Sequence, residues 1–195
     1  MNMKRLLNRL PAPIRKFLRA EDAAVIAEAV IVLPILLWAY VGLFVYWDCF
    51  RSLNTVQKAS YTISEMLSRE KSKNGITSSY ITGMQKVLEY LIDKDQNSSL
   101  RVTSINYNTV NAQFQVQWSR TTNPAVYPVL TTTSLQNYTS QIPTMNAGDS
   151  VVIVEVSVPY VPLFNVGLTN QVFSEFIVTR PRFQPCIVMD GILCG

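Results

Sequence analysis

Residues 23–47 read AAVIAEAVIVLPILLWAYVGLFVYW and decide how this chain folds. Glu28 is the one charged side chain in this apolar run. A helix of this length extends for roughly 37 Å, enough to cross a hydrocarbon core of about 30 Å with some tilt. Because backbone polar groups in lipid must find partners within the segment, we expect a single transmembrane helix. Pro34 removes one backbone hydrogen bond, so we expect it to kink this helix without ending it.

Positive charge is concentrated before this helix. Residues 1–22 contain six basic and two acidic side chains, a net charge of +4, and the whole chain of 195 residues is also +4. Basic residues favour the cytoplasmic side of a membrane, so we expect residues 1–22 to be a cytoplasmic leader and residues 48–195 a periplasmic domain of a bacterial inner-membrane protein. The charge is a topology signal, since no basic patch with interleaved aromatics follows that would bind nucleic acid.

The apolar run is an anchor and not a removable signal. It is longer than the apolar region of a usual secretory signal, and no small-x-small cleavage site follows it. Asp48 stands before Cys49, where a lipoprotein would have a small residue, so we do not expect lipidation there. The prediction is a single-pass protein with membrane lipid as one partner.

Glu28 is the candidate functional residue of the anchor. A carboxylate at the centre of a bilayer costs a few kcal/mol, so such residues are usually functional or paired. Two interpretations stay open, because Glu28 is only about one turn into the apolar run. It is either an acid tolerated near the headgroups or a carboxylate kept in the membrane for a specific cation.

The residues around Glu28 carry a family resemblance. A basic leader is followed by EDAAVIAE (residues 21–28) and by an apolar helix that contains Pro34. This arrangement resembles the TadE-like pseudopilins of tight-adherence (Flp-type) pilus systems over roughly residues 15 to 60. In that family a prepilin peptidase cuts after a small residue, usually glycine, and an acid stands fifth in the mature chain. The resemblance implies processing between Ala23 and Ala24, which would make Glu28 the fifth residue.

The resemblance also implies a function. The chain would be a structural subunit, a minor pseudopilin of an adhesive type IVb/Flp pilus or tight-adherence secretion system. Its partners would be other pilin or pseudopilin subunits, the prepilin peptidase and the inner-membrane pilus platform. The new α-amino group at Ala24 would carry a positive charge near neutral pH, and it would attract Glu28 of a neighbouring helix strongly in low dielectric. Whether the subunit belongs to the fibre, its tip or the basal machinery stays open.

The part after the anchor predicts an α+β domain. Apolar residues from Phe50 to Leu67 recur at helical spacing, so the anchor helix should continue as one face of a soluble core. A second helix is expected over residues 77–93, with Thr77 as N-cap. Its buried face should contain Ile81, Met84, Val87, Leu88 and Leu91.

Alternating apolar residues predict four strands. Residues 102–107 and 110–118 should form a hairpin that turns at Asn108-Thr109, with a slip in alternation at Ser104 and one solvated amide-rich face. Residues 150–159 and 172–179 should form the other two strands. A long helix packed on a small antiparallel sheet is similar to a pilin head.

The remaining motifs concern cysteines and missing chemistry. Cys186 and Cys194 can meet across a turn at Asp190-Gly191 and form a disulfide in the periplasm, the alternative being two thiols. Cys49 is left over and could pair only between subunits. The chain has no histidine, no glycine-rich phosphate loop and no Cys-x-x-Cys pair, so we expect no enzyme, no cofactor and no metal site.

Two alternative functions were weighed against the pilus subunit. The first is a bitopic inner-membrane protein whose periplasmic domain binds a ligand or an envelope component, with the helix as a plain tether. The second is a membrane-tethered hydrolase that uses only exported carboxylates.

Overall fold

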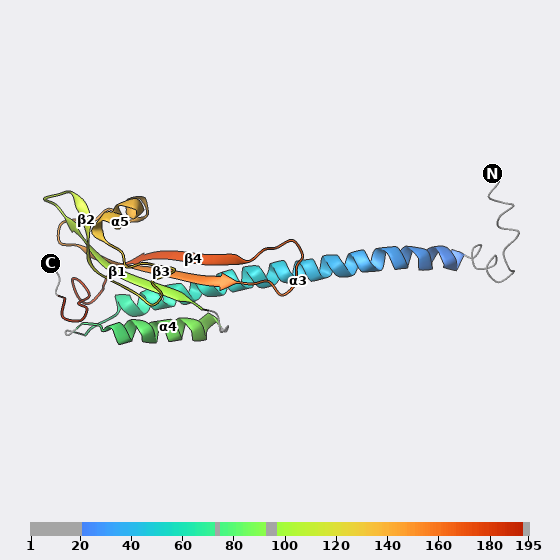
Figure 1. Ribbon diagram of the computed structural model, residues 1–195, viewed down its shortest axis with the longest axis horizontal. Helices are drawn as coiled ribbons and strands as arrows, with labels where there is room; N and C mark the ends of the chain where they lie inside the picture. Colours follow the sequence, from blue (N-terminus) through green and yellow to red (C-terminus); the bar gives the residue numbers. More distant parts are fainter. Residues whose placement is uncertain (1–20, 73–74, 93–96, 193–195) are drawn as a thin grey trace, which may run out of the picture.

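One long helix organises the molecule, and its C-terminal half is built into an α+β head (Figure 1). The computed structural model describes residues 21–72, 75–92 and 97–192, with side chains from Val25 onward. The elements in chain order are α3 (Glu21–Ser68), α4 (Ser78–Ile92), β1 (Ser99–Asn108), β2 (Gln113–Thr121), α5 (Thr132–Leu135), the 3-10 helix η1 (Gln136–Gln141), β3 (Ser150–Tyr160) and β4 (Gln171–Thr179). The predicted fold class, a long apolar helix followed by a small antiparallel sheet, is confirmed.

Helix α3 contains 48 residues and runs through Pro34 without ending. Its second half is amphipathic, and its buried side chains recur at spacings of three and four: Val56, Ala59, Ile63 and Leu67. Ser60 lies on this face and donates a hydrogen bond of 2.8 Å to the carbonyl of Val56, so its hydroxyl is satisfied inside the helix. The predicted continuation beyond the membrane span is therefore confirmed. The kink at Pro34 stays a prediction.

A tight connection joins α3 to α4. The backbone N–H of Arg182 donates to the carbonyl of Ser68 at 2.9 Å and so satisfies an end of α3. Gly75 has a φ of +81°, and a Cβ there would collide with the carbonyl of Val188. Only glycine fits this close approach. Thr77 then caps α4 by accepting the N–H of Tyr80 at 3.3 Å, as the sequence predicts.

The buried face of α4 differs in part from the expected one. Ile81, Met84 and Leu88 are buried as predicted, and Ile92 joins them. Val87 and Leu91 are instead 36% and 37% exposed, because they lie at the edges of the stripe that faces α3 and the sheet. The buried apolar stripe of α4 is therefore narrower than the apolar residues in its sequence indicate.

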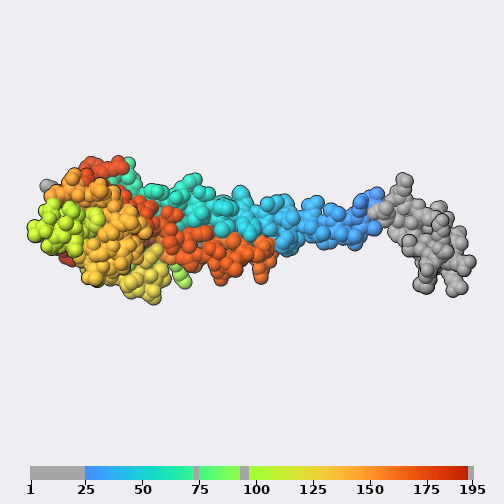
Figure 2. All heavy atoms as spheres, turned by 90° about the horizontal axis from the view of Figure 1, so that it is seen from above, coloured from blue at the N-terminus to red at the C-terminus, as the bar shows by residue number. Residues whose placement is uncertain are grey.

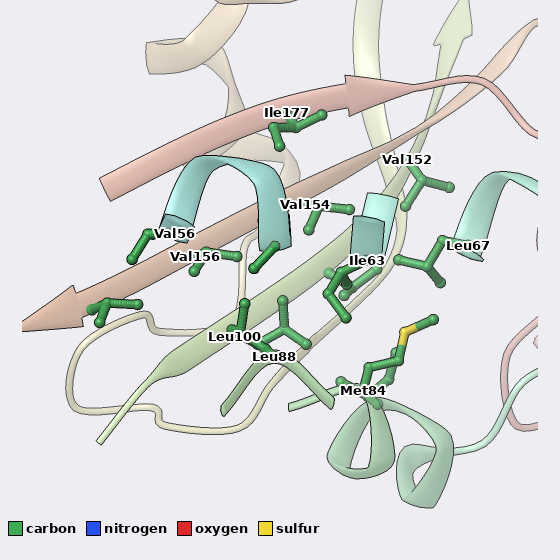
Figure 3. Close-up of a cluster of buried hydrophobic side chains, with 14 of the residues drawn as sticks. Val56, Ile63, Leu67, Met84, Leu88, Leu100, Val152, Val154, Val156 and Ile177 are labelled. Atoms are coloured by element: carbon green, nitrogen blue, oxygen red, sulfur yellow. The ribbon is translucent and has the colours of Figure 1, made fainter. Parts of the chain in front are cut away.

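The sheet has the order β2-β1-β3-β4, with every neighbouring pair antiparallel. Helices α3 and α4 cover one face (Figure 1). On that face the alternate residues Val152, Val154 and Val156 of β3 meet Ile63 and Leu67 of α3 in the main core (Figure 3). Alternation along β3 therefore turns these three valines toward the helices.

The opposite face of the sheet is covered too, which corrects the expectation of a solvated face. Residues 130–145, including α5 and η1, pack over β1 and β3 and enclose Ile105, Leu135, Val151 and Ile153. Polar residues there are satisfied at the edge strand, where the hydroxyl of Thr132 accepts the N–H of Val116 at 3.1 Å. The head therefore has three layers around two apolar clusters.

A bulge in the hairpin explains why both faces are apolar. Ser104 and Ile105 of β1 lie opposite Trp118 and Val116 of β2, so Gln117 is an extra residue. The slip predicted at Ser104 is confirmed. Because of it, Trp118 faces the helices while Val116 faces the other cluster, and the strict alternation of β2 does not define one buried face. The expected strand start at Val110 is also wrong, since Val110 is 90% exposed in the turn before β2.

Candidate functional site

The N-terminal half of α3 projects from the head as a bare apolar rod (Figure 2). Its large side chains are exposed, for example Val25 at 64% and Leu43 at 71%. Among the described residues, α3 is the one helix long and apolar enough to cross a membrane. Apolar surface of this extent is unfavourable in water, so lipid or other apolar helices must cover it. These features are consistent with a single-pass membrane protein.

Glu28 lies on this exposed part of α3, about one turn beyond Ala24. Ala23 and Ala24 belong to the first turn of the helix, and their side chains lie outside the described part. In a straight helix the backbone nitrogen of Ala24 and the Cα of Glu28 are about 6 Å apart along the axis. Processing at the Ala23–Ala24 bond stays a prediction.

Asp48 marks the end of the apolar run and holds the head to α3. The hydroxyl of Tyr160, the last residue of β3, donates to Oδ2 of Asp48 at 2.9 Å. Tyr160 is 1% exposed, and its ring stacks on Phe173 with 5.3 Å between centroids. Burial, and then the bond to Asp48, raise the pKa of Tyr160 well above its ordinary value. The phenol therefore stays a donor throughout the physiological range.

A second polar contact lies inside the sheet. The guanidinium of Arg101 in β1 donates twice to the Glu155 carboxylate in β3, each bond measuring 2.6 Å, and once to the carbonyl of Pro128. Arg101 also lies over the ring of Tyr127 at 4.9 Å. Burial lowers the pKa of Arg101, but the bonds to Glu155 outweigh it and the pKa is raised. This paired charge holds the strands in register and is closed to a substrate.

Two surface grooves lie at opposite ends of the sheet. The first, of about 350 Å³, is lined in part by amide side chains of β1 and β2, among them Asn106, Gln115 and Gln117, and by Pro185. The second, of about 500 Å³, belongs to the β3–β4 connection and is lined by Pro162, Asn165, Leu168, Thr169 and Asn170. Among the described residues, neither lining includes a charged side chain. They suit neutral hydrogen-bonding partners.

The cysteines are placed in two regions. Cys186 is buried and disulfide-bonded, and Cys49 is a thiol on α3. Cys194, the partner expected for Cys186, lies outside the described residues, so that pairing stays a prediction. Within the described ranges, no cluster of three or more acidic or cysteine side chains could hold a metal ion.

The sequence did not predict either of the two polar contacts described above, Asp48–Tyr160 and Arg101–Glu155. No partner was predicted for Arg101 or Glu155, yet Glu155 is 3% exposed in a central strand. A usable signal existed, since an arginine and a glutamate each interrupt a strand of β-branched residues. Tyr160 carried no such signal, because its partner is 112 positions away.

Comparison with known proteins adds no relative. No family model matches the chain, and no similar protein was found among the curated proteins or the solved structures. The function is therefore argued from the geometry above.

Proposed function

We propose that this chain is a structural subunit, a TadE-like minor pseudopilin of an adhesive type IVb/Flp pilus or tight-adherence secretion system. The observation that carries this proposal is the position of Glu28. It is the one charged residue in the apolar run of residues 23–47, on a helix whose C-terminal half is built into the head. Such a helix suits both anchoring in lipid and packing against copies of itself. Its work is structural and not catalytic.

The charge of Glu28 fixes the axial position of one subunit relative to its neighbour. An unpaired carboxylate in an apolar medium is costly, and so is an unpaired ammonium group. Processing at Ala23–Ala24 creates an ammonium group at the same depth as Glu28 of a neighbour shifted along the axis. Pairing the ammonium group with the carboxylate removes the cost of leaving each charge alone in an apolar medium. The axial offset between neighbouring subunits that pairs them is therefore favoured over all others. The partners are other pilin or pseudopilin subunits, the prepilin peptidase and the inner-membrane platform.

Processing is tested by the intact mass of the protein extracted from membranes of its native host. We expect a product that begins at Ala24 and carries the Glu28 carboxylate. A population consisting only of the full-length chain would contradict processing, and with it the amine that Glu28 is proposed to pair.

The role of Glu28 is tested by Glu28→Gln, with Glu28→Asp as the charge-preserving counterpart and Glu175→Gln in β4 as the control in the head. We expect Glu28→Gln to abolish assembly into sheared surface filaments or the secretion complex while the head still folds. Glu28→Asp should retain part of the assembly, and Glu175→Gln all of it. Normal assembly by Glu28→Gln would exclude the proposed pairing.

The amide-lined groove favours a second function. An uncharged groove of about 350 Å³ at the far end of the sheet suits a ligand or envelope component held by neutral hydrogen bonds. In that case α3 is a plain tether, and Glu28→Gln is tolerated because losing the charge eases insertion. Replacing Gln115, which lines the groove, would then impair function while Glu28→Gln would not.

A further inference from the structure

The connection between β3 and β4 is unusually apolar for an exposed loop. Residues 161–170 read VPLFNVGLTN and contain no charged side chain. Val161, Leu163 and Phe164 are 64%, 70% and 53% exposed, and Val172 at the start of β4 is 63% exposed. Single exposed apolar residues are common on proteins, but a contiguous group indicates a surface that is covered by something else.

This loop lies beside the membrane-spanning part of α3. The bond between Tyr160 and Asp48 places the end of β3 beside the first residue after the apolar run. From there the loop continues toward the N-terminal end of α3, as the two perpendicular views show (Figures 1 and 2). Val45 is 1% exposed and Val41 is half-buried, so one face of α3 is already covered inside the apolar run. The overlap from Val41 to Trp47 corresponds to about 10 Å of helix.

The overlap places the loop at the boundary of the bilayer. The apolar run of roughly 37 Å exceeds a hydrocarbon core of about 30 Å, so its last turn extends into the headgroup region. Tyr46 and Trp47 lie at this level, 44% and 55% exposed, as aromatic residues do at membrane interfaces. The guanidinium of Arg51 lies 5.5 Å from the ring of Trp47, on the aqueous side.

We propose that the β3–β4 loop inserts Val161, Leu163 and Phe164 into the headgroup–acyl boundary of the membrane that α3 spans. The loop and α3 then form one continuous lipid-facing surface. Asn165, Thr169 and Asn170 keep contact with headgroups and water, which an irregular backbone requires, so insertion stops at the interface. Two attachments, α3 and this loop, hold the head against the bilayer with a defined tilt. This inference is independent of processing at Ala23–Ala24.

The loop is tested in the full-length protein in lipid nanodiscs by tryptophan quenching. Trp38 and Trp47 are replaced by phenylalanine, and Trp118, which is 4% exposed in the head, remains as an internal reference. Phe164→Trp then reports on the loop. Val110→Trp is the matched control, because Val110 is an exposed apolar residue of the β1–β2 turn, remote from the loop at the other end of the sheet.

We expect lipids brominated near the headgroup end of the acyl chain to quench most of the emission added by Phe164→Trp and none of that added by Val110→Trp. Acrylamide in the aqueous phase should quench the emission added by Val110→Trp more than the emission added by Phe164→Trp. Equal behaviour of the two variants would overturn the proposal. So would a Phe164→Trp emission that is protected from acrylamide but insensitive to brominated lipid, because a protein would then be the occupant.

A charged variant separates insertion from mere proximity. Leu163→Asp combined with Phe164→Trp should lose the quenching by brominated lipid, since a carboxylate resists transfer into the boundary. The emission of Trp118 should stay unchanged if the head is intact. Quenching that persists in this variant would overturn the proposal, because the loop would then lie near lipid without inserting.

Discussion

Arg101 of β1 and Glu155 of β3 carry opposite charges and lie opposite each other in two paired strands. Most of the other residues of these two strands are buried. Both side chains are less than 5% exposed, and each of the three guanidinium nitrogens donates one hydrogen bond to Glu155 or to the carbonyl of Pro128. Desolvation of two charges is expensive, and good geometry in the pair offsets that cost. The pair therefore favours this register more than it adds to stability.

This interpretation predicts an asymmetry between single and double variants. Arg101→Met or Glu155→Leu alone should lower the free energy of unfolding by about 3–5 kcal/mol, because each leaves one buried charge unpaired. The double variant should lose much less. Denaturant unfolding of the solubilised protein, followed by circular dichroism, measures both. A double variant as unstable as the sum of the two singles would contradict this interpretation, because it would show that the two charges are not coupled.

Helix α3 combines two environments in one element. Its N-terminal half has apolar side chains on all sides, as a segment surrounded by lipid requires, while its C-terminal half has a single apolar stripe against the sheet. The change occurs between Val41 and Asp48, where the head first covers one face. Because the helix is continuous there, forces on the anchor pass directly into the core of the head.

The stripe predicts which residues of α3 stabilise the head. Ile63 is fully buried, and Ile63→Ala should lower the free energy of unfolding by about 2–5 kcal/mol, since it leaves a cavity between the helix and β3. Tyr61, two residues earlier, is 57% exposed and serves as the control. Tyr61→Ala should change stability by no more than about 0.5 kcal/mol. Equal effects in denaturant unfolding would contradict the assigned faces.

At the scale of the whole molecule, the head lies at one end of a rod formed by α3 (Figure 1). The basic residues of the leader precede α3 in the sequence. Residues 1–22 carry the entire net charge of +4. Positive charge within reach of a span keeps that side in the cytoplasm. A cytoplasmic leader and a periplasmic head therefore follow as the proposed orientation.

Protease protection tests this orientation. Protease added outside spheroplasts should digest the head and leave the leader attached to α3. Replacing Lys4, Arg5 and Arg9 by glutamine should shift part of the population to the inverted topology. Replacing Lys58, Lys71 and Lys86 in the head should not, because they lie on the translocated side. A protected head in the unaltered protein would refute the proposed orientation.

The sequence by itself determined the elements that depend on neighbouring residues. A long apolar run, with Glu28 as its one charged residue, specifies the helix of the anchor, and spacings of three and four specify its amphipathic continuation and α4. Spacings of two specify β3 and most of β2, and the broken alternation at Ser104 indicated the bulge. Each of these signals lies within a few turns of chain, so local periodicity carries it.

The tertiary structure alone decided how these elements meet. It covered both faces of the sheet, split β2 between two clusters at Gln117, and paired Arg101 with Glu155 and Asp48 with Tyr160. The partners in these two pairs are 54 and 112 positions apart. Such contacts depend on strand register and on the angle at which α3 crosses the sheet, and neither property is encoded in the periodicity of a single segment.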